Sequence, residues 1–560
     1  MKGRFHRMSG QECCEEPSPR AALWISRGLF IAAAIAQLVV AVRFWSLTWD
    51  DSAITLGFAR TFAATGRIEP TPGSGVVEGY STTLWMLLMT GAAKVLTSPA
   101  ALLAGAKIAT LVLNVANLVL IRAWFKSWAG ESTANLVAAV VGFEAMFYET
   151  INGMETPLIM SLVLVMLVLL PRRDRASRVF YLLCGSLLLL TRWEAAWLLL
   201  PFLLVEFLRS KRLRGLGTWA AVFAGSNLLR WMYFGSLLPN TIIAKQRVPY
   251  SLPSRRVALE QHLLEPIHLL LSIKLILVLV VAAVAYDLLL RSRRPAYVRA
   301  AERIRDSWQL SFVVLFTVFS LILSVGIGRN WGPPFRSFYS AWPFLVCILI
   351  LPVISRRSRR GVVIAMVCVG AVTARHAYAH MRDLHAPEAP VYMPQITVDN
   401  IGRLGTLVEQ IQEMSHRPTL TFAGPDMGGV MLNAPHTRVV DLGLLCDRTL
   451  ARQGFVAIGP YVLDQRRPDL IATHTMWTAY AGFQRYPEFF AMYRPVYFHG
   501  VRFFMSRQLI GDIGESRFAE ESYSTGAPQI AASEVIPGVN VYDHSDAALN
   551  RRFATYLILR

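Results

Sequence analysis

Residues 21–51 read AALWISRGLFIAAAIAQLVVAVRFWSLTWDD, an apolar run that ends in two tryptophans and a pair of aspartates. An α-helix needs about 20 apolar residues to cross the hydrocarbon core of a bilayer, and Trp45 and Trp49 are typical of the membrane–water boundary. The stretch therefore predicts a spanning helix that leaves the membrane just before Asp50 and Asp51. No small-residue cleavage pattern precedes Trp49, so we expect the helix to be retained and not removed as a signal sequence.

The composition extends this prediction to the whole chain. The 560 residues are 54% hydrophobic and 17% charged, with a mean hydropathy of +0.41, whereas a soluble protein carries about 25% charged residues. The net charge is +19, but the basic residues lie in short clusters between apolar blocks and not on one face, which argues against a nucleic-acid-binding protein. The six cysteines lack CxxC and Cys/His spacing, so we expect neither a zinc site nor a disulfide framework. The predicted class is a polytopic α-helical membrane protein.

About eleven apolar blocks have roughly the length of a membrane span. They cover residues 22–44, 102–121, 136–147, 158–170, 179–190, 195–207, 219–234, 264–290, 310–327, 338–354 and 361–372. The two short blocks on either side of Arg192 leave open a tight hairpin instead of two full crossings. The block 82–96 is predicted to be an interfacial or re-entrant helix that returns to the side it left.

Lys and Arg gather in every second gap between the blocks, and such gaps are typically cytoplasmic. These gaps contain Arg122 and Lys126, Arg172 to Arg178, Arg209 to Arg214, Arg291 to Arg305 and Arg356 to Arg360. The other gaps carry acidic, amide and aromatic residues. We therefore expect a cytoplasmic tail at 1–20, a transmembrane domain at 21–378 whose first external loop and interfacial helix span 45–98, and an extracytoplasmic domain at 379–560.

The segment 379–560 is predicted to be a small α/β domain. Short buried strands are expected at 419–424, 438–441, 468–473 and 501–505, interleaved with helical segments such as 445–453. The turn Gly424-Pro-Asp-Met-Gly-Gly429 follows the first strand and is similar in composition to a phosphate-binding loop. It matches neither GxGxxG nor a P-loop, so a plain strand-to-helix turn is the favoured interpretation. The polar segment 522–539 is predicted to be a flexible arm.

Asp50 and Asp51 are the candidate catalytic residues. Adjacent carboxylates repel, so one can have a raised pKa and deprotonate an acceptor hydroxyl, while its neighbour binds substrate or a cation. A solvated loop start explains the pair about equally well from composition alone. The sequence leaves open whether a divalent cation takes part.

Other polar residues expected on the same side are candidates for substrate binding. They are Glu78, Tyr80, Glu155, Arg192, Glu194, Asn240, Lys245, Arg329 and Arg336. The structural alternatives are a helix cap with an aromatic belt residue for Glu78 and Tyr80 and a helix N-terminal charge for Glu155. Arg192 and Glu194 are expected either to pair with each other or to line a water-filled cavity. Lys245, Arg329 and Arg336 suit an anionic group. Arg247, Arg255 and Arg256 are rivals, and ordinary surface solubility is the alternative, which is favoured for Arg255 and Arg256.

Carboxylates, cations and aromatic side chains at one membrane boundary suit a substrate that has a lipid tail, a phosphate and a sugar. The tail would enter the bilayer, the phosphate would meet Arg or Lys, and the sugar would stack on Trp or Tyr beside the aspartates. Because no ATP-binding motif is present, an activated lipid would supply the leaving group. Cations would then stabilise the departing phosphate as its charge develops.

Several motifs in this order resemble the GT-C superfamily of membrane glycosyltransferases, over roughly residues 20 to 380. They are Trp49-Asp-Asp51, Val77-Glu-Gly-Tyr-Ser-Thr-Thr-Leu-Trp85, Asn152-Gly-Met-Glu-Thr-Pro157, Leu190-Thr-Arg-Trp-Glu194 and Pro239-Asn-Thr-Ile-Ile-Ala-Lys245. The chain is most similar in this respect to the bacterial terminal β-(1→2) arabinofuranosyltransferases. The resemblance implies a polyprenyl-phosphate sugar donor such as decaprenylphosphoryl-arabinofuranose and a glycan or glycoprotein acceptor. It also implies a multi-pass protein of the bacterial inner membrane, with its acid/base role on Asp50 or Asp51.

The chain departs from that family at one motif. Relatives often carry Gly-Gly-Asp-Trp where this chain has Gly328-Arg329-Asn330-Trp331, so a carboxylate is missing and a cation is gained. The tail is similar only in its placement and in Asp441-Leu-Gly-Leu444, and a role in holding the acceptor is an expectation by analogy.

Two other classes of function compete with a glycosyltransferase. A transporter or flippase of lipid-linked sugars would place polar residues near the bilayer midplane and often shows two similar halves, and neither feature is visible here. A non-catalytic assembly factor that binds cell-wall glycan through its tail would leave the paired aspartates without a role.

Overall fold

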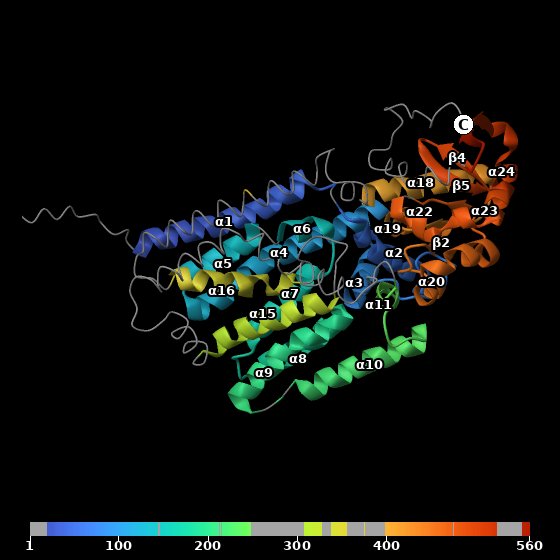
Figure 1. The fold of residues 1–560 in the computed structure, drawn as a ribbon. Helices are drawn as coiled ribbons and strands as arrows, with labels where there is room; N and C mark the ends of the chain where they lie inside the picture. The colour runs from blue at the N-terminus through green and yellow to red at the C-terminus, as the bar shows by residue number, and fades with distance from the viewer. Residues whose placement is uncertain are drawn as a thin grey trace, which may run out of the picture.

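The computed structural model describes residues 19–46, 48–143, 146–211, 213, 215–247, 307–327, 338–354, 375, 398–473, 475–522 and 552–560. Within these ranges a helical bundle occupies one end of an elongated molecule and a sheet domain the other (Figure 1). The predicted blocks 264–290 and 361–372 lie outside the described residues. So do Arg329, Arg336 and nearly all of the predicted arm, at 523–539.

Every predicted apolar block in the described part of the chain carries a helix. These helices are α1 (Pro19–Arg43), α4 (Pro99–Ala129), α5 (Glu131–Phe143), α6 (Met146–Asn152), α7 (Thr156–Leu169), α8 (Arg175–Thr191), α9 (Ala196–Ser210), α10 (Leu216–Phe234), α15 (Trp308–Ile327) and α16 (Trp342–Ile354). The block 136–147 is divided between α5 and α6. Leu23–Arg43 and Pro99–Ala129 are long and apolar enough to cross a membrane, whereas the other apolar helices of the described part are shorter.

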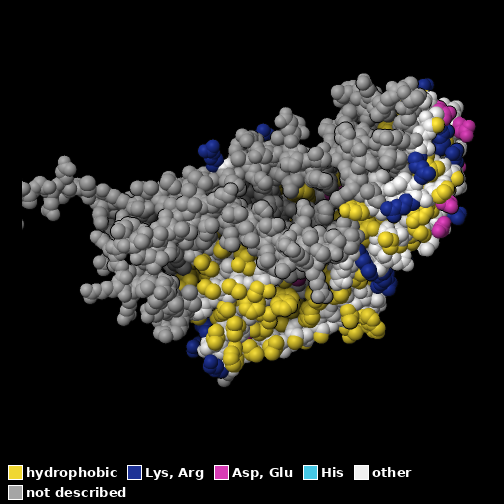
Figure 2. Space-filling view, in the orientation of Figure 1, with side chains coloured by type: hydrophobic (Ala, Val, Ile, Leu, Met, Phe, Trp, Pro, Cys, Tyr) yellow, Lys and Arg dark blue, Asp and Glu magenta, His cyan; other side chains and the backbone are white. Residues whose placement is uncertain are grey.

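The outward surface of this bundle is apolar. On α1 the exposed side chains include Ile31, Ile35, Leu38, Val39 and Val42, and α4, α8, α9, α10 and α15 also expose large aliphatic or aromatic residues. Figure 2 shows hydrophobic side chains over the lower part of the bundle, where described residues are in view, whereas most of the charged side chains in this view lie on the sheet domain. A soluble monomer rarely exposes contiguous apolar surface of this extent. The surface is that of a helical membrane protein.

The helices α8 and α9 form a hairpin around Arg192. They are joined by the short helix η1 (Trp193–Ala195) and contain 17 and 15 residues. At 1.5 Å per residue each is about 22 to 26 Å long, somewhat less than the roughly 30 Å hydrocarbon thickness of a bilayer. The sequence left a hairpin of this kind open as an alternative.

Three short helices lie between the bundle and the sheet domain. They are α2 (Asp50–Thr65), α3 (Thr83–Ala93) and α11 (Asn240–Lys245). The 11 residues of α3 are about 16 Å long and fall within the block expected to be interfacial. Because α2 packs on α3 and on α19 (Gly428–Asn433) of the sheet domain, it connects the two parts of the molecule.

In the described part of the sheet domain, seven strands form a mixed sheet in the order β2-β1-β3-β5-β4-β7-β6. Its strands are β1 (Leu420–Gly424), β2 (Thr437–Asp441), β3 (Leu470–Ile471), β4 (Tyr493–Phe498), β5 (Val501–Ser506), β6 (Phe518–Ser522) and β7 (Thr555–Leu559). The four predicted strands correspond to β1, β2, β3 and β5, and the α/β prediction agrees with this domain. The turn His499-Gly500, with positive φ at both residues, forms a tight hairpin between β4 and β5.

Helices surround this sheet. They include α18 (Val398–Ser415), α19, α20 (Arg448–Gln453), α22 (Thr475–Ala481), α23 (Pro487–Met492) and α24 (Arg507–Ile513). In the register of β1 and β2, Gly424 lies opposite Asp441. The two parallel strands therefore end at the same edge of the sheet, and the segments that follow them face α2 and α11.

Candidate functional site

The carboxylate of Asp50 is bound by the sheet domain. Its two oxygens accept hydrogen bonds from the backbone N–H groups of Gly428 (2.8 Å) and Gly429 (2.6 Å), which open α19. A carboxylate at this position satisfies orphan amides and interacts favourably with the helix dipole. Burial raises the pKa of Asp50 well above its usual value, and the nearby charge of Asp426 adds to this, while the two N–H groups act in the opposite direction.

This contact settles the nature of the glycine-rich turn 424–429. The amides of Gly428 and Gly429, which would have to bind a phosphate, are occupied by Asp50, so the turn is a strand-to-helix connection. Gly428 is required because a Cβ atom there would lie 2.1 Å from the carbonyl oxygen of Asp50 and 2.9 Å from the nitrogen of Ile54. Helices α2 and α19 are thus in backbone contact.

Asp51 occupies a different environment from its neighbour. Successive residues of a helix differ in direction by about 100°, so the two carboxylates cannot both face α19. Asp50 is 3% exposed, whereas Asp51 is only half-buried. Of the two candidate catalytic acids, Asp51 is therefore the more accessible one.

Lys107, on α4, holds the segment that leads to these aspartates. Its ammonium group donates hydrogen bonds to the carbonyl oxygen of Trp45 and the hydroxyl of Thr48 and lies 4.5 Å from the centre of the Trp45 ring. The carbonyl of Thr48 in turn accepts a hydrogen bond from Val398, at the start of α18 (2.9 Å). The sequence analysis missed Lys107, although a single charge inside an apolar block is a recognised signal of function.

Glu78 forms an ion pair with Arg230 on α10, with 2.7 Å between Oε2 and Nε. Burial raises the pKa of Glu78, and the pairing with Arg230 partly offsets this effect. Glu78 is not the cap of α3, which was its structural alternative, because α3 begins at Thr83 and its N-cap residue is Thr82. Tyr80 is buried and packs edge-on against Phe58 of α2. Arg230 was missed because it lies in the apolar block 219–234.

Asn240, at the start of α11, joins the segment before α3 to the sheet domain. Its side-chain amide donates to the carbonyl oxygens of Leu444 (3.3 Å), Leu445 (2.8 Å) and Asp447 (3.2 Å), and its backbone N–H donates to the carbonyl of Glu78 (3.2 Å). We therefore find that Asn240 acts as a structural connector.

The two basic residues near the end of α11 differ in their surroundings. Lys245 is exposed and stays a candidate for an anionic group. Arg247, its rival, donates from its guanidinium group to the carbonyl oxygens of Ala451 and Arg452. The guanidinium of Arg247 is thus engaged by the backbone of the sheet domain.

Arg192 lies between two carboxylates. Its Nη1 is 3.1 Å from Oε1 of Glu155 and its Nε is 2.7 Å from Oε1 of Glu194, which confirms the predicted pairing of Arg192 with Glu194. Glu155 is fully buried and precedes α7, without a side-chain capping hydrogen bond. Its charge is compensated by Arg192 and not by the helix alone.

Two further buried acids lie at the end of β2 and shortly after it. The sequence analysis noted Asp441 only as part of Asp441-Leu-Gly-Leu444 and did not single out Asp447. Asp441 accepts hydrogen bonds from the N–H groups of Gly443 and Cys446, each 2.7 Å long, and burial raises its pKa to about 7. Asp447 caps α20 through the N–H groups of Thr449 and Leu450, both at 2.9 Å. The position of Asp441 at the end of a predicted strand was the available signal for it. Asp447 lay inside the predicted helical segment 445–453, whereas α20 begins only at Arg448, so its role as a cap was not visible.

The acids of this region therefore differ in their environment. Asp51 is half-buried, whereas Asp50, Asp441 and Asp447 accept hydrogen bonds from backbone N–H groups. In the part of the chain that the structure describes, no group of three or more His, Cys, Asp or Glu side chains is placed to hold a metal ion. Asp51 lies at the start of α2, Asp50 links α2 to α19 of the sheet domain, and Asp441 holds the loop that follows β2.

No protein-family model and no curated protein sequence matches this chain. Among solved structures, ArnT from Cupriavidus metallidurans bound to undecaprenyl phosphate is similar at 15% identity and TM-score 0.44, with 80% of each chain covered. The Archaeoglobus fulgidus oligosaccharyltransferase in complex with Zn and sulfate is similar at 11% identity and TM-score 0.48, over 80% of this chain and 68% of that one. The same enzyme tethered to an acceptor peptide with the NVT sequon is similar at 10% identity and TM-score 0.43, over 74% and 64%.

Proposed function

We propose that this protein is a GT-C-type glycosyltransferase that moves a sugar from a polyprenyl phosphate to an extracytoplasmic glycan or glycoprotein. Arabinofuranose is the sugar that the sequence motifs favour. The observation that carries the proposal is the position of Asp50 and Asp51, at the end of an apolar helix and beneath the sheet domain. A lipid-linked donor and a polar acceptor can approach such a boundary from opposite sides.

We assign the two aspartates different roles. Asp50 is bound to the amides of α19 and serves as a positioning residue. Asp51 takes the proton of the acceptor hydroxyl while that oxygen forms a bond to the anomeric carbon. The bond from the anomeric carbon to the phosphate oxygen breaks, and the lipid phosphate leaves with the electron pair.

Cations on the same side would stabilise the phosphate as its charge develops. Lys245 is exposed at the end of α11 and is our candidate in the described part of the chain, together with Arg329 and Arg336 from the sequence. Arg192, Glu194 and Glu155 form a cluster of two ion pairs that share one cation, and we assign them to shaping the site. The lipid tail would lie along the outward apolar faces of the bundle.

We also propose that residues 21–378 lie in the bacterial inner membrane and that residues 379–560 lie on the periplasmic side. Arg27, Arg122 and Lys126 gather where α4 ends, away from α3 and the sheet domain. Basic residues favour the cytoplasmic side, so this distribution supports an extracytoplasmic sheet domain. The loops after β1 and β2 are then the part of that domain closest to the acceptor.

The decisive experiment is a transfer assay with purified protein in detergent, given decaprenylphosphoryl-arabinofuranose and an arabinan acceptor. A glycosyltransferase forms product in detergent, whereas a flippase or a glycan-binding assembly factor does not. We expect D51N to lose product formation by a factor of about 100 or more. The matched control D464N, at an exposed acid of the sheet domain, should keep full activity. Equal activity of D51N and the unmodified protein would refute the assignment.

A further inference from the structure

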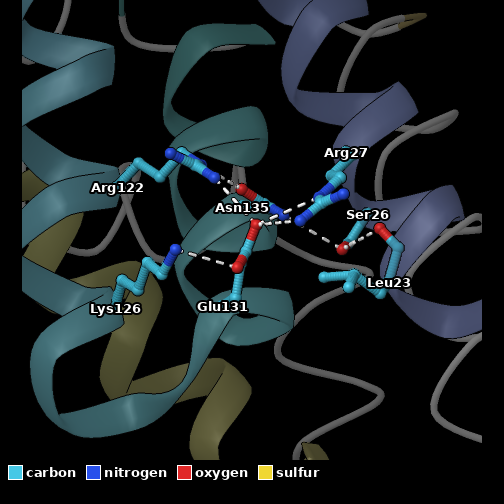
Figure 3. A network of polar contacts seen from close by, with 7 residues as sticks. All are labelled: Leu23, Ser26, Arg27, Arg122, Lys126, Glu131 and Asn135. Atoms are coloured by element: carbon cyan, nitrogen blue, oxygen red, sulfur yellow. Dashed lines mark hydrogen bonds and ion pairs between the residues drawn. The ribbon is translucent and has the colours of Figure 1, made fainter. Parts of the chain in front are cut away.

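A cluster of three cations and one carboxylate ties together α1, α4 and α5, far from the proposed active site. Oε1 of Glu131 lies 2.9 Å from Arg27 Nη2 and 2.8 Å from Arg122 Nη2, and Oε2 lies 2.9 Å from Lys126 Nζ. Figure 3 shows Glu131 between Arg27 on one side and Arg122 and Lys126 on the other. Asn135 extends the network by accepting from Arg122 (2.7 Å) and donating to Ser26 (3.2 Å).

The charges in this cluster do not balance. Three cations share one carboxylate, so the four side chains carry a net charge of +2. The cationic side chains are 41%, 30% and 49% exposed for Arg27, Arg122 and Lys126, whereas that of Glu131 is only 18% exposed. The positive charge is therefore presented outward and the negative charge inward.

The cluster also adjoins a surface suited to acyl chains. Trp24 is 68% exposed on α1, and the guanidinium of Arg27 lies 5.7 Å from the centre of its ring. Exposed tryptophan is typical of the membrane interface. Further along α1, Ile31 and Ile35 are exposed, so an apolar strip begins where the cations end.

We propose that this cluster binds the headgroup of an anionic phospholipid. The guanidinium groups of Arg27 and Arg122 have the planar geometry that matches two phosphate oxygens, and Lys126 adds a point charge. The acyl chains would lie along the exposed face of α1. A free phosphate ion could satisfy the cations but would make no use of Trp24 or of the apolar strip.

The test uses delipidated full-length protein in detergent, titrated with palmitoyl-oleoyl phosphatidylglycerol and followed by native mass spectrometry. Each basic residue near a lipid surface contributes about a fivefold change in affinity. We expect R27Q/K126Q to bind the lipid about 25-fold more weakly than the unmodified protein. The control R172Q removes one charge from the exposed turn before α8 and should bind normally. Equal binding by R27Q/K126Q and the unmodified protein would overturn the proposal.

A second variant separates lipid binding from a purely structural role of the cluster. E131Q breaks the same three ion pairs but leaves all three cations, so we expect it to bind phosphatidylglycerol about fivefold more tightly. Weaker binding by folded E131Q would instead assign the cations to holding the helices together. Phosphatidylcholine should bind poorly, and millimolar inorganic phosphate should not displace phosphatidylglycerol. Effective competition by inorganic phosphate would show a simple anion site and refute the lipid assignment.

Discussion

Two ion clusters in the helical bundle have opposite composition. In the part of the bundle that contacts α3 through Trp85 and Gly153, Arg192 lies between Glu155 and Glu194. Where α4 ends, Glu131 lies among Arg27, Arg122 and Lys126. The first cluster has an excess of negative charge and the second an excess of positive charge.

The two clusters also differ in their contact with solvent. The side chains of Arg192 and Glu155 are 12% and 1% exposed, whereas Lys126 is 49% exposed. A buried charge has to be compensated by a nearby partner, because its removal from water is costly. An exposed charge is free to meet a ligand from outside. We infer that the Arg192 cluster shapes the proposed active site and that the Glu131 cluster contacts the membrane surface.

The largest effect that follows from this comparison is expected for R192M. The substitution leaves Glu155 buried without its cation, and breaking a buried pair costs about 3 to 5 kcal/mol. The matched control R494M breaks the exposed pair with Glu520 and should cost less than about 1 kcal/mol. Chemical unfolding in detergent measures the free energy of unfolding of both variants. Similar losses for the two variants would contradict the distinction between buried and exposed clusters.

The next largest effect concerns the contact between α2 and α19. In G428A the new methyl group would overlap the carbonyl oxygen of Asp50, which is a backbone atom that cannot move alone. We expect a loss of about 3 kcal/mol in the free energy of unfolding and a fall in transfer activity. The control G225A, on α10, meets no atom within 4 Å. If G428A is as stable as G225A, the two helices are not in the contact described.

The effect expected to be smallest within a single pH unit is a pH dependence of the stability of the sheet domain. The pKa of buried Asp441 is about 7, above its usual value of 3.8, so the folded state keeps a proton that the unfolded state releases. This contribution to stability is fully present below about pH 4 and is lost as the pH rises through 7. D441N should lack it, so the stability of the unmodified protein relative to D441N should fall over this range by at most about 1.4 kcal/mol per pH unit. A constant difference between pH 4 and 8 would contradict the assignment.

Local features of the fold could be predicted from the sequence. Hydrophobic blocks produced helices because their length and composition leave few alternatives in a membrane. The strands predicted at 419–424 and 438–441 agree within one residue with β1 and β2, because these segments are short, largely apolar and bounded by turn residues. The pairing of Arg192 with Glu194 followed from the cost of isolated charges between apolar segments.

The long-range contacts could not be predicted in this way. Asp50 and Gly429 are 379 residues apart, and nothing in either segment specifies the other as its partner. For the same reason β7 was missed, since its place between β4 and β6 depends on the assembled sheet. The sequence identified the two aspartates as a pair, but only tertiary packing distinguishes their environments.

The most direct test of the account compares D50N and D51N in the same preparation, by transfer rate and by thermal unfolding. We predict that D51N unfolds like the unmodified protein but transfers sugar at least about 100-fold more slowly. For D50N, whose amide cannot accept from both N–H groups of α19, we predict a lower unfolding temperature. Full transfer activity in D51N, or unchanged stability in D50N, would contradict the separate roles of the two carboxylates.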